Sequence, residues 1–146
     1  MSSAPSKTAA GCTCMRLRKA SRRVSQIYDR SLEPLGLTVT QYSLLSYLHA
    51  FDGISIGMLA DKLVMDPTTL TRNVRPLERQ GYVVLAPDPN DRRSRCLHLT
   101  GSGRSILSQA KPAWARAQRH IDKAIGDAGV PQLNATLDRV LQHLSL

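Results

Sequence analysis

A chain of 146 residues has room for one domain with a real hydrophobic core, but not for a second independent core. Its 20 Lys and Arg against 11 Asp and Glu give a net charge of +9, which favours nucleic acid or an anionic membrane surface as partner. No apolar run approaches the ~18 residues of a membrane span, and the start lacks the apolar core of a signal peptide. We therefore expect a cytoplasmic protein that does not enter a membrane.

Cysteine use and short motifs exclude several further classes. Three cysteines, an odd number for a reducing compartment, argue against a disulfide framework. The sequence has no P-loop, no GxGxxG and no HExxH motif, so we expect no cofactor. We also expect no metal, because two thiols would need further ligands and the histidines lack ligand-type spacing. These histidines are His49, His98, His120 and His143.

The N-terminal part of the chain predicts a tail and one helix. Residues 1–11 are small and polar without periodicity, and they predict a flexible tail. From Thr13 to about Leu35, apolar side chains recur at helical spacing while basic side chains crowd the other faces. Pro34 and Gly36 are typical of a helix end, so we expect a helix within residues 12–36.

The next elements have the spacing of a helix-turn-helix. A helix is predicted from Thr40 to Phe51, with Phe51 and three leucines directed inward. Residues 53–57 then predict a brief extended link, and a short helix should run from Met58 to Leu63. After two more residues another helix begins at Asp66, which is the spacing of a helix-turn-helix.

This last helix is shaped for a nucleic-acid groove. Asp66 is a good N-cap, Pro67 suits the first turn, and Gly81 is typical of the end. One face is apolar, and the opposite face collects Thr68, Arg72, Arg75 and Arg79. Pro76 removes one backbone hydrogen bond, so we expect a bend near Arg72.

A basic β-hairpin is expected directly after this helix. The segments Val83–Ala86 and Cys96–Leu99 predict short strands, joined by a turn-rich loop with three arginines at its tip, Arg92, Arg93 and Arg95. A basic helix face alone is usually a solvated surface, and an Arg-rich hairpin alone can serve only to keep an edge soluble. Together, and in this order, they predict a winged helix-turn-helix that binds nucleic acid.

Two amphipathic helices complete the predicted fold. Thr100 should cap a long helix that bends at most at Pro112 and ends at Gly126 and Gly129, and a Leu-rich helix should start at Pro131. Their apolar surface exceeds what the compact centre can cover, which favours a two-fold dimer over the alternative of a monomeric helical core. The expected dimerisation residues are Leu17, Val24, Leu133, Leu137, Leu141 and Leu144. The fold is thus predicted as mainly α with a small β-hairpin wing, divided into dimerisation helices at 12–36 and 104–146 and a winged helix-turn-helix DNA-binding lobe at 37–103.

The chain resembles the MarR family of bacterial transcriptional regulators over roughly residues 13–145. The runs LTVTQYSLLSYL (37–48), LADKLVMDPTTLTRNVRPLERQGYV (59–83) and DPNDRRSRCLHLTGSG (88–103) carry the resemblance. The most specific signature is Asp-Arg-Arg in the wing, followed by Leu-Thr and a Gly three residues on.

The resemblance also implies roles for single residues. Asp91 would brace the hairpin, and Arg93 would reach a minor groove. The major groove would be faced by Thr68, Thr69, Arg72 and Arg75, and we add Asn73, Arg92 and Arg95 as DNA-binding candidates. Pro76 and a Cys-x-Cys at the start of the first helix depart from the family pattern.

Cys12 and Cys14 lie where a helix begins, and five basic side chains follow within nine residues. The helix dipole and this local charge favour the reactive thiolate form, so oxidation or alkylation of these residues is a hypothesis for sensing. The alternative is that both are inert small residues. Cys96 is a weaker candidate, because an alternating strand pattern could bury it.

These observations favour a dimeric, sequence-specific DNA-binding regulator, a repressor released by a small ligand in a crevice between the dimer helices and the DNA-binding lobe, or by cysteine oxidation. Its operator would be pseudo-palindromic. The alternative is a largely non-specific architectural nucleic-acid-binding protein. A thiol enzyme is disfavoured, because no His and carboxylate constellation accompanies the cysteines.

Overall fold

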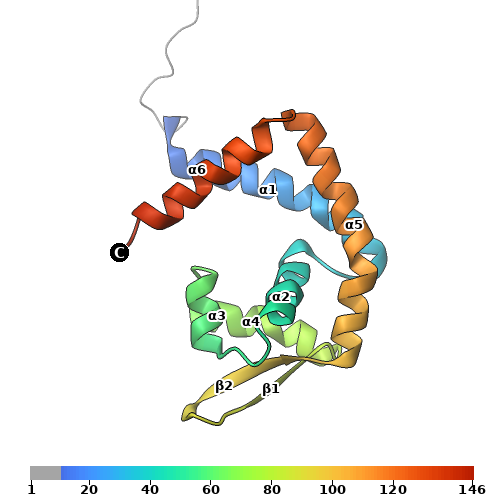
Figure 1. Ribbon diagram of the computed structural model, residues 1–146, viewed down its shortest axis with the longest axis vertical. Coiled ribbons are helices and arrows are strands. Elements are labelled where there is room, and N and C mark those ends of the chain that lie inside the picture. Colours follow the sequence, from blue (N-terminus) through green and yellow to red (C-terminus); the bar gives the residue numbers. More distant parts are fainter. Residues whose placement is uncertain (1–10) are drawn as a thin grey trace, which may run out of the picture. The chain divides into compact units, whose positions relative to one another are not determined.

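The computed structural model describes residues 11–146, so the predicted tail at 1–11 lies outside the described residues except for Gly11. The chain divides into two compact units. We call the part up to Ser31 together with Trp114–Leu146 the helical unit, and Leu32–Ala113 the winged unit. Figure 1 shows the order of the elements along the chain.

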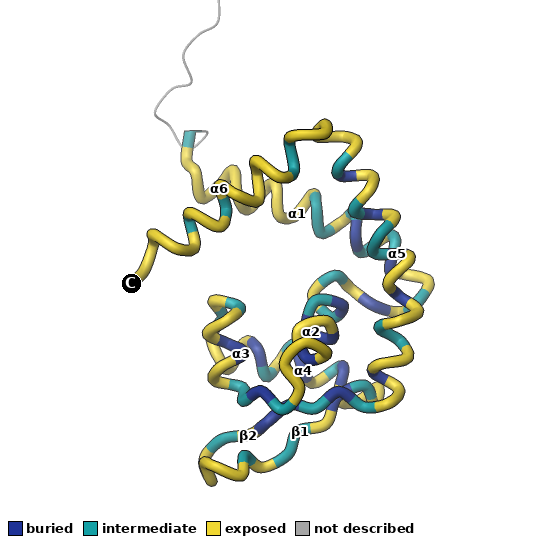
Figure 2. The backbone as a smooth tube through the Cα atoms, in the orientation of Figure 1, coloured by how far each residue is buried: buried dark blue, intermediate teal, exposed yellow. Residues whose placement is uncertain are grey.

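The winged unit contains a short 3-10 turn, three helices, a hairpin and the first half of a long helix. These are η2 (Glu33–Leu35), α2 (Val39–Ala50), α3 (Ile56–Lys62), α4 (Pro67–Arg79), β1 (Val83–Asp88), β2 (Asp91–Leu99) and α5 (Gly101–Ile125), of which α5 continues into the helical unit. Their fully buried side chains are mostly leucines, including Leu44, Leu45, Leu48, Leu59, Leu70, Leu77 and Leu97. This apolar core, dark blue in Figure 2, fixes α4 and the hairpin against α2 and α3.

Side-chain hydrogen bonds cap the N-termini of α2 and α3. Thr38 and Gln41 form a reciprocal capping box at α2, and the Ser55 hydroxyl accepts from the backbone N–H of Met58 at α3. These caps explain why α2 begins one residue and α3 two residues before the predicted positions. The last helix, α6 (Gly129–His143), also begins two residues before the predicted Pro131.

Phe51 was predicted to point inward, and this is wrong. It is 43% exposed and stacks on Tyr47, with 6.3 Å between the ring centroids. The Lys62 ammonium lies 4.4 Å from the centre of the Phe51 ring, a cation–π contact that gives the aromatic ring a polar neighbour at the surface.

The helical unit consists of α1 (Thr13–Leu32), the second half of α5, and α6. Tyr28 is buried, stacks on Trp114 at 6.4 Å, and donates its hydroxyl hydrogen to the Gln118 side-chain oxygen. Gln118 in turn donates to Asp122 at 2.9 Å. This chain of contacts joins α1 to α5, whereas α6 has no buried residue and is drawn as exposed over most of its length in Figure 2.

The turn between α3 and α4 holds a strained residue. Val64 has a φ of 51°, a left-handed conformation in which a β-branched side chain is crowded, and the side chain is 77% exposed. Backbone hydrogen bonds from Val64 N–H to Asp61 O and from Met65 N–H to Ala60 O hold this turn.

Val64→Asn should therefore raise the free energy of unfolding by about 1 kcal/mol, because Asn tolerates the left-handed conformation and little apolar burial is lost. Urea denaturation followed by circular dichroism measures the change. Val84→Asn, at an exposed position of β1, is the matched control and should be destabilising. A loss of stability in Val64→Asn would contradict the assignment of strain.

Candidate nucleic-acid interface

The two helices of the helix-turn-helix are α3 and α4. Asp66 caps α4 as predicted, because its carboxylate accepts from the backbone N–H of Thr68 at 2.7 Å and Pro67 occupies the first turn. Gly81 follows the helix with a φ of 78°, the left-handed conformation that ends it. The helix continues through Pro76 as far as Arg79. The bend expected near Arg72 stays a prediction.

The two faces of α4 differ as the sequence indicates. Leu70, Val74 and Leu77 are buried in the winged unit. The exposed side carries Thr68, Thr69, Arg72, Arg75 and Arg79. One side of the helix therefore anchors it, and the other presents three guanidinium groups and two hydroxyls to solvent.

Asn73 lies on the flank of this helix. It is half-buried, and its amide nitrogen lies 3.7 Å from the sulfur of Met65 in the turn before α4. The Thr71 hydroxyl donates to the backbone oxygen of Pro67, within the helix itself. These two side chains are engaged inside the helix-turn-helix, in contrast to the exposed arginines.

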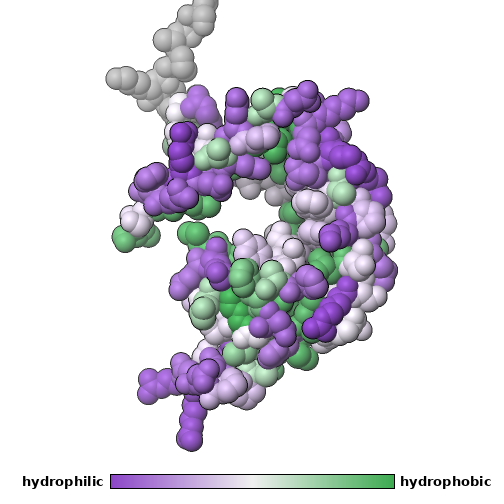
Figure 3. Space-filling view, viewed as in Figure 1, coloured by the Kyte–Doolittle hydropathy of each residue, from purple (hydrophilic) through white to green (hydrophobic). Residues whose placement is uncertain are grey.

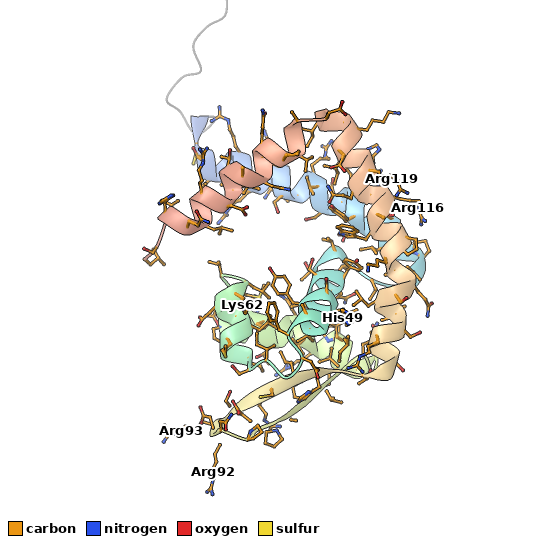
Figure 4. The ribbon with its side chains drawn as sticks, in the orientation of Figure 1. His49, Lys62, Arg92, Arg93, Arg116 and Arg119 are labelled. Atoms are coloured by element: carbon orange, nitrogen blue, oxygen red, sulfur yellow. The ribbon has the colours of Figure 1, made fainter. Side chains whose placement is uncertain are left out.

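The hairpin is longer than predicted, and its turn is shorter. Strands β1 and β2 pair from Val83 with Leu99 to Pro87 with Arg95, and the register shifts between Pro87 and Asp88 before the turn at Pro89 and Asn90. The expected loop is wrong in this respect, because most of it is strand β2. The exposed arginines of this strand are Arg92, Arg93 and Arg95. Figure 4 shows Arg92 and Arg93 projecting from the far end of the hairpin.

Side-chain carboxylates organise the hairpin turn. Asp91 accepts a hydrogen bond from the backbone N–H of Arg93 at 2.9 Å, and Asp88 accepts one from that of Asn90 at 2.8 Å. Both bonds join residues two apart, as in Asx-turns. These two hydrogen bonds fix the backbone of the turn next to the hairpin arginines.

A third segment pairs with the hairpin and was not predicted. Ser55 forms an isolated bridge with Cys96, and Leu97 N–H donates to Ile54 O at 2.9 Å. Gly53 N–H donates back to Leu97 O at 3.0 Å. The link before α3 therefore ties the hairpin to the helix-turn-helix.

The base of the hairpin is closed by Thr100 and Gly103. Thr100 donates its hydroxyl hydrogen to Gly81 O at 2.6 Å and accepts from the Gly103 N–H at 3.0 Å, which makes it the predicted cap of α5. A Cβ on Gly103 would lie 2.2 Å from Tyr82 O and 2.8 Å from Leu99 Cδ1. Only glycine allows this close approach, which positions α4, the hairpin and α5 together.

Three cysteines occupy two kinds of environment. Cys12 and Cys14 are exposed, and the Cys12 backbone oxygen accepts from Arg16 N–H at the start of α1. Cys96 is buried on β2, as the strand pattern suggested. Burial, and next the neighbouring Asp88 carboxylate, raise the pKa of the Cys96 thiol, so its thiolate is disfavoured.

An apolar hollow of about 400 Å³ opens in the helical unit between α1, α5 and α6. Among its lining residues are Leu17, Val24, Ile121, Leu133 and Leu137. Leu141 and Leu144 do not line it and are 63% and 75% exposed. Four of the six predicted dimerisation residues are thus gathered around one hollow.

The described residues have neither a membrane-spanning helix nor a metal-binding cluster. No helix in residues 11–146 is long and apolar enough to cross a membrane. Within the same part of the chain, no three His, Cys, Asp or Glu side chains are grouped so that they could hold a metal ion.

The structure combines α3 and α4, whose second helix has an exposed face, with the hairpin of β1 and β2 and with the long helix α5 that follows the hairpin. This combination defines a winged helix-turn-helix protein. The MarR family model matches residues 35–94. The transcriptional activatory protein BadR of Rhodopseudomonas palustris is 31% identical over 132 residues, 88% of this chain and 74% of BadR. The chain belongs to the MarR family of transcriptional regulators.

A solved structure and a further sequence relative agree with this assignment. The transcriptional regulator MosR of M. tuberculosis in complex with DNA is 34% identical, with a TM-score of 0.80 over 92% of this chain and 99% of MosR. The organic hydroperoxide resistance transcriptional regulator of Bacillus subtilis is 28% identical over 97 residues, 66% of each chain. The predicted fold, mainly helical with a hairpin wing, is confirmed.

Proposed function

We propose that the protein is a dimeric, sequence-specific DNA-binding regulator that represses transcription until an oxidant or a small ligand releases it. The observation that carries this proposal is the exposed face of α4, with Thr68, Arg72 and Arg75, together with the exposed arginines of β2 in the hairpin that follows α4. An α-helix fits the major groove, and arginine is the commonest reader of guanine there. The complex of MosR with DNA supports DNA as the partner.

The helix α4 and the wing would make different kinds of DNA contact. The middle of α4, with Arg72, would read base edges, and the Arg93 side chain at the wing would contact backbone or a minor groove. Thr68, Thr69 and Arg75 would add contacts beside Arg72. The hydrogen bond from Arg93 N–H to Asp91 supports the proposed role of Asp91 as a brace of the wing. Because Asn73 is half-buried against Met65, a base contact from it would need a change of side-chain rotamer.

Arg72→Ala should weaken operator binding by about 1–3 kcal/mol and relax the preference at particular base pairs. Arg93→Ala should weaken all sequences alike and lower the salt dependence by about one unit. Binding-site selection with the purified protein, followed by titration of selected and random duplexes, measures both effects. Equal losses on operator and random DNA for the two variants would refute this division of labour.

The same titration separates a regulator from an architectural protein. A regulator should prefer its operator over random duplex by ~10³-fold or more at physiological salt. A parent protein that binds both duplexes alike is an architectural nucleic-acid-binding protein.

We propose that two copies of the chain dimerise through their helical units. The hollow between α1, α5 and α6 is apolar, and α6 buries none of its own residues. A second copy would cover Leu17, Val24, Leu133 and Leu137, and a two-fold dimer would place half-sites about one helical turn, ~10 bp, apart. Leu141 and Leu144 would extend this contact toward the C-terminus.

The sign of regulation is a separate part of the proposal. BadR is named as an activatory protein, whereas we propose repression. A reporter under a promoter that contains the selected operator distinguishes the two, because a repressor lowers its expression and an activator raises it.

For the signal, the exposure of Cys12 and Cys14 beside the basic start of α1 favours thiol oxidation. In this step a thiolate sulfur attacks one peroxide oxygen, an S–O bond forms and the O–O bond breaks, so that the sulfur is oxidised to a sulfenic acid. The other oxygen leaves as hydroxide or alkoxide and takes a proton from water, so that the peroxide is reduced to water or an alcohol. The name of the Bacillus subtilis relative refers to resistance to organic hydroperoxide, which supports a peroxide as the oxidant to test.

Peroxide should lower the operator affinity of the parent about tenfold or more, and dithiothreitol should restore it. The Cys12→Ser, Cys14→Ser double variant should bind like the reduced parent and ignore peroxide. Cys96→Ser is the control, since a buried thiol with a raised pKa should not respond. If the double variant still loses binding under peroxide, a small-molecule effector becomes the better proposal.

A further inference from the structure

Most of the net charge of the described chain belongs to the helical unit and not to the winged unit that carries the proposed operator-reading surface. The winged unit has nine Lys and Arg against seven Asp and Glu, a net charge of +2. The described residues of the helical unit, 11–31 and 114–146, have ten against four, a net charge of +6. Figure 3 shows hydrophilic side chains over the helices of this unit. This distribution is unexpected if DNA contacts only α4 and the wing.

Much of this charge forms a straight row on α1. Arg16, Lys19, Arg23 and Arg30 recur at i, i+3, i+7 and i+14, which places them on one helix face, and all four are exposed. We call these four residues the α1 row. It extends over about 21 Å at 1.5 Å per residue. A hollow of about 290 Å³ lies on it, lined by Arg23, Gln26, Ile27 and Arg30.

In the free protein this row is electrostatically unfavourable. The first turn of α1 has no acidic residue, so the positive end of the helix dipole meets further positive charge. Lys19 and Arg23 are four residues apart, and like charges at this spacing repel. Within residues 11–146, no carboxylate lies within 4.0 Å of a cationic group of the row. The helix therefore holds repulsion that a bound polyanion would relieve.

A membrane surface fits this row less well than a nucleic acid. A helix that binds a bilayer surface inserts its apolar side, but the apolar side of α1, with Leu17, Val24 and Tyr28, lines the hollow of the helical unit. What remains available is a row of point charges about 21 Å long. Measured along the helix axis of B-DNA, where one strand has one phosphate per ~3.4 Å, that length spans about six phosphates of one strand.

We infer that the α1 row is a second DNA-contacting surface, which binds the phosphate backbone without regard to sequence. The choice of DNA as the polyanion rests on the proposed function, whereas the site itself is independent of α4 and the wing. Such a surface would contact DNA outside the operator or on a second duplex. The protein would then bind long DNA more tightly than its base contacts alone allow.

The test compares two triple variants of the full chain that remove the same charge. The row variant is Lys19→Gln, Arg23→Gln, Arg30→Gln. The control is Lys111→Gln, Lys123→Gln, Arg139→Gln, three exposed cations outside the row. Affinity for a random-sequence duplex of about 40 bp is measured from about 50 to 200 mM salt, where each lost phosphate contact reduces the slope by about 0.9.

The row variant should lose about two to three units of slope and about tenfold or more in affinity, and the control should keep the parent's slope. A row variant with the parent's slope overturns the inference, even if Arg72→Ala behaves as proposed. A parent that binds no duplex at all overturns the proposed function as well. Loss of binding to phosphatidylglycerol vesicles with an unchanged DNA slope identifies the row as a membrane surface and also overturns it.

The melting temperature of the row variant shows whether a loss of DNA binding comes from lost phosphate contacts or from a loss of folded structure. Because like charges are removed, the row variant without DNA should melt at the parent's temperature or slightly higher. If it melts lower, the single variant Arg23→Gln replaces it, with an expected loss of about one unit of slope. An unchanged slope in that folded single variant refutes the inference.

Discussion

Leu133→Glu combined with Leu137→Glu is expected to yield monomeric or unfolded protein in place of a dimer. Both side chains line the apolar hollow between α1, α5 and α6, and a partner that covers it would have to bury two carboxylates. Burial of unpaired charge costs more than about 3 kcal/mol, enough to dissociate an ordinary dimer at micromolar concentration. Light scattering measures the mass, and circular dichroism shows whether helices remain.

The matched control places the same charges on the opposite side of α6. Ala135→Glu combined with Gln142→Glu changes exposed residues that do not line the hollow. This variant should keep the mass of the parent. A normal dimer in the Leu133 and Leu137 variant would mean that the subunits meet elsewhere, and a monomeric parent would refute the proposed dimer altogether.

Gly103→Ala is expected to lower the free energy of unfolding by about 2–4 kcal/mol. The added methyl group would meet Tyr82 O at 2.2 Å and Leu99 Cδ1 at 2.8 Å. A backbone oxygen cannot move aside as a flexible side chain can, so the hairpin base or α5 must shift. Urea denaturation followed at 222 nm measures the loss.

Gly101→Ala provides the control in the same turn of α5. A Cβ there meets nothing within 4 Å, and alanine favours helix, so this variant should be neutral or slightly more stable. Operator affinity should also fall in Gly103→Ala and not in Gly101→Ala, because the contact at Gly103 aligns α4 with the wing. Two variants of equal stability would contradict the role given to this contact.

Local chemistry explains which elements the sequence predicted well. Asp66 and Thr100 cap their helices through side-chain hydrogen bonds to nearby backbone, and such bonds depend on a few consecutive residues. The buried stripe of α4 follows from the helical period alone. The positions of Arg72 and Arg75 on the exposed face follow from the same period.

Long-range contacts explain what the sequence did not predict. The polar run from Asp91 to Arg95 reads as a loop, but pairing with β1 extends the strand through it. The bridge of Ser55 with Cys96 joins segments about forty residues apart and leaves no local signal. Phe51 lies at the surface, where Tyr47 stacks on its ring and the Lys62 ammonium lies over it, and neither neighbour can be identified from periodicity.

The buried thiol of Cys96 provides a built-in reporter of local opening. Cys12 and Cys14 are exposed and can be blocked first with a reversible reagent, whereas Cys96 can react only when β2 separates from its neighbours. When closing is fast, the alkylation rate of Cys96 divided by that of a free thiol equals the equilibrium constant for this opening. Labelling kinetics would thus give the local opening free energy of the wing directly, with and without DNA, in the natural sequence and without an added probe.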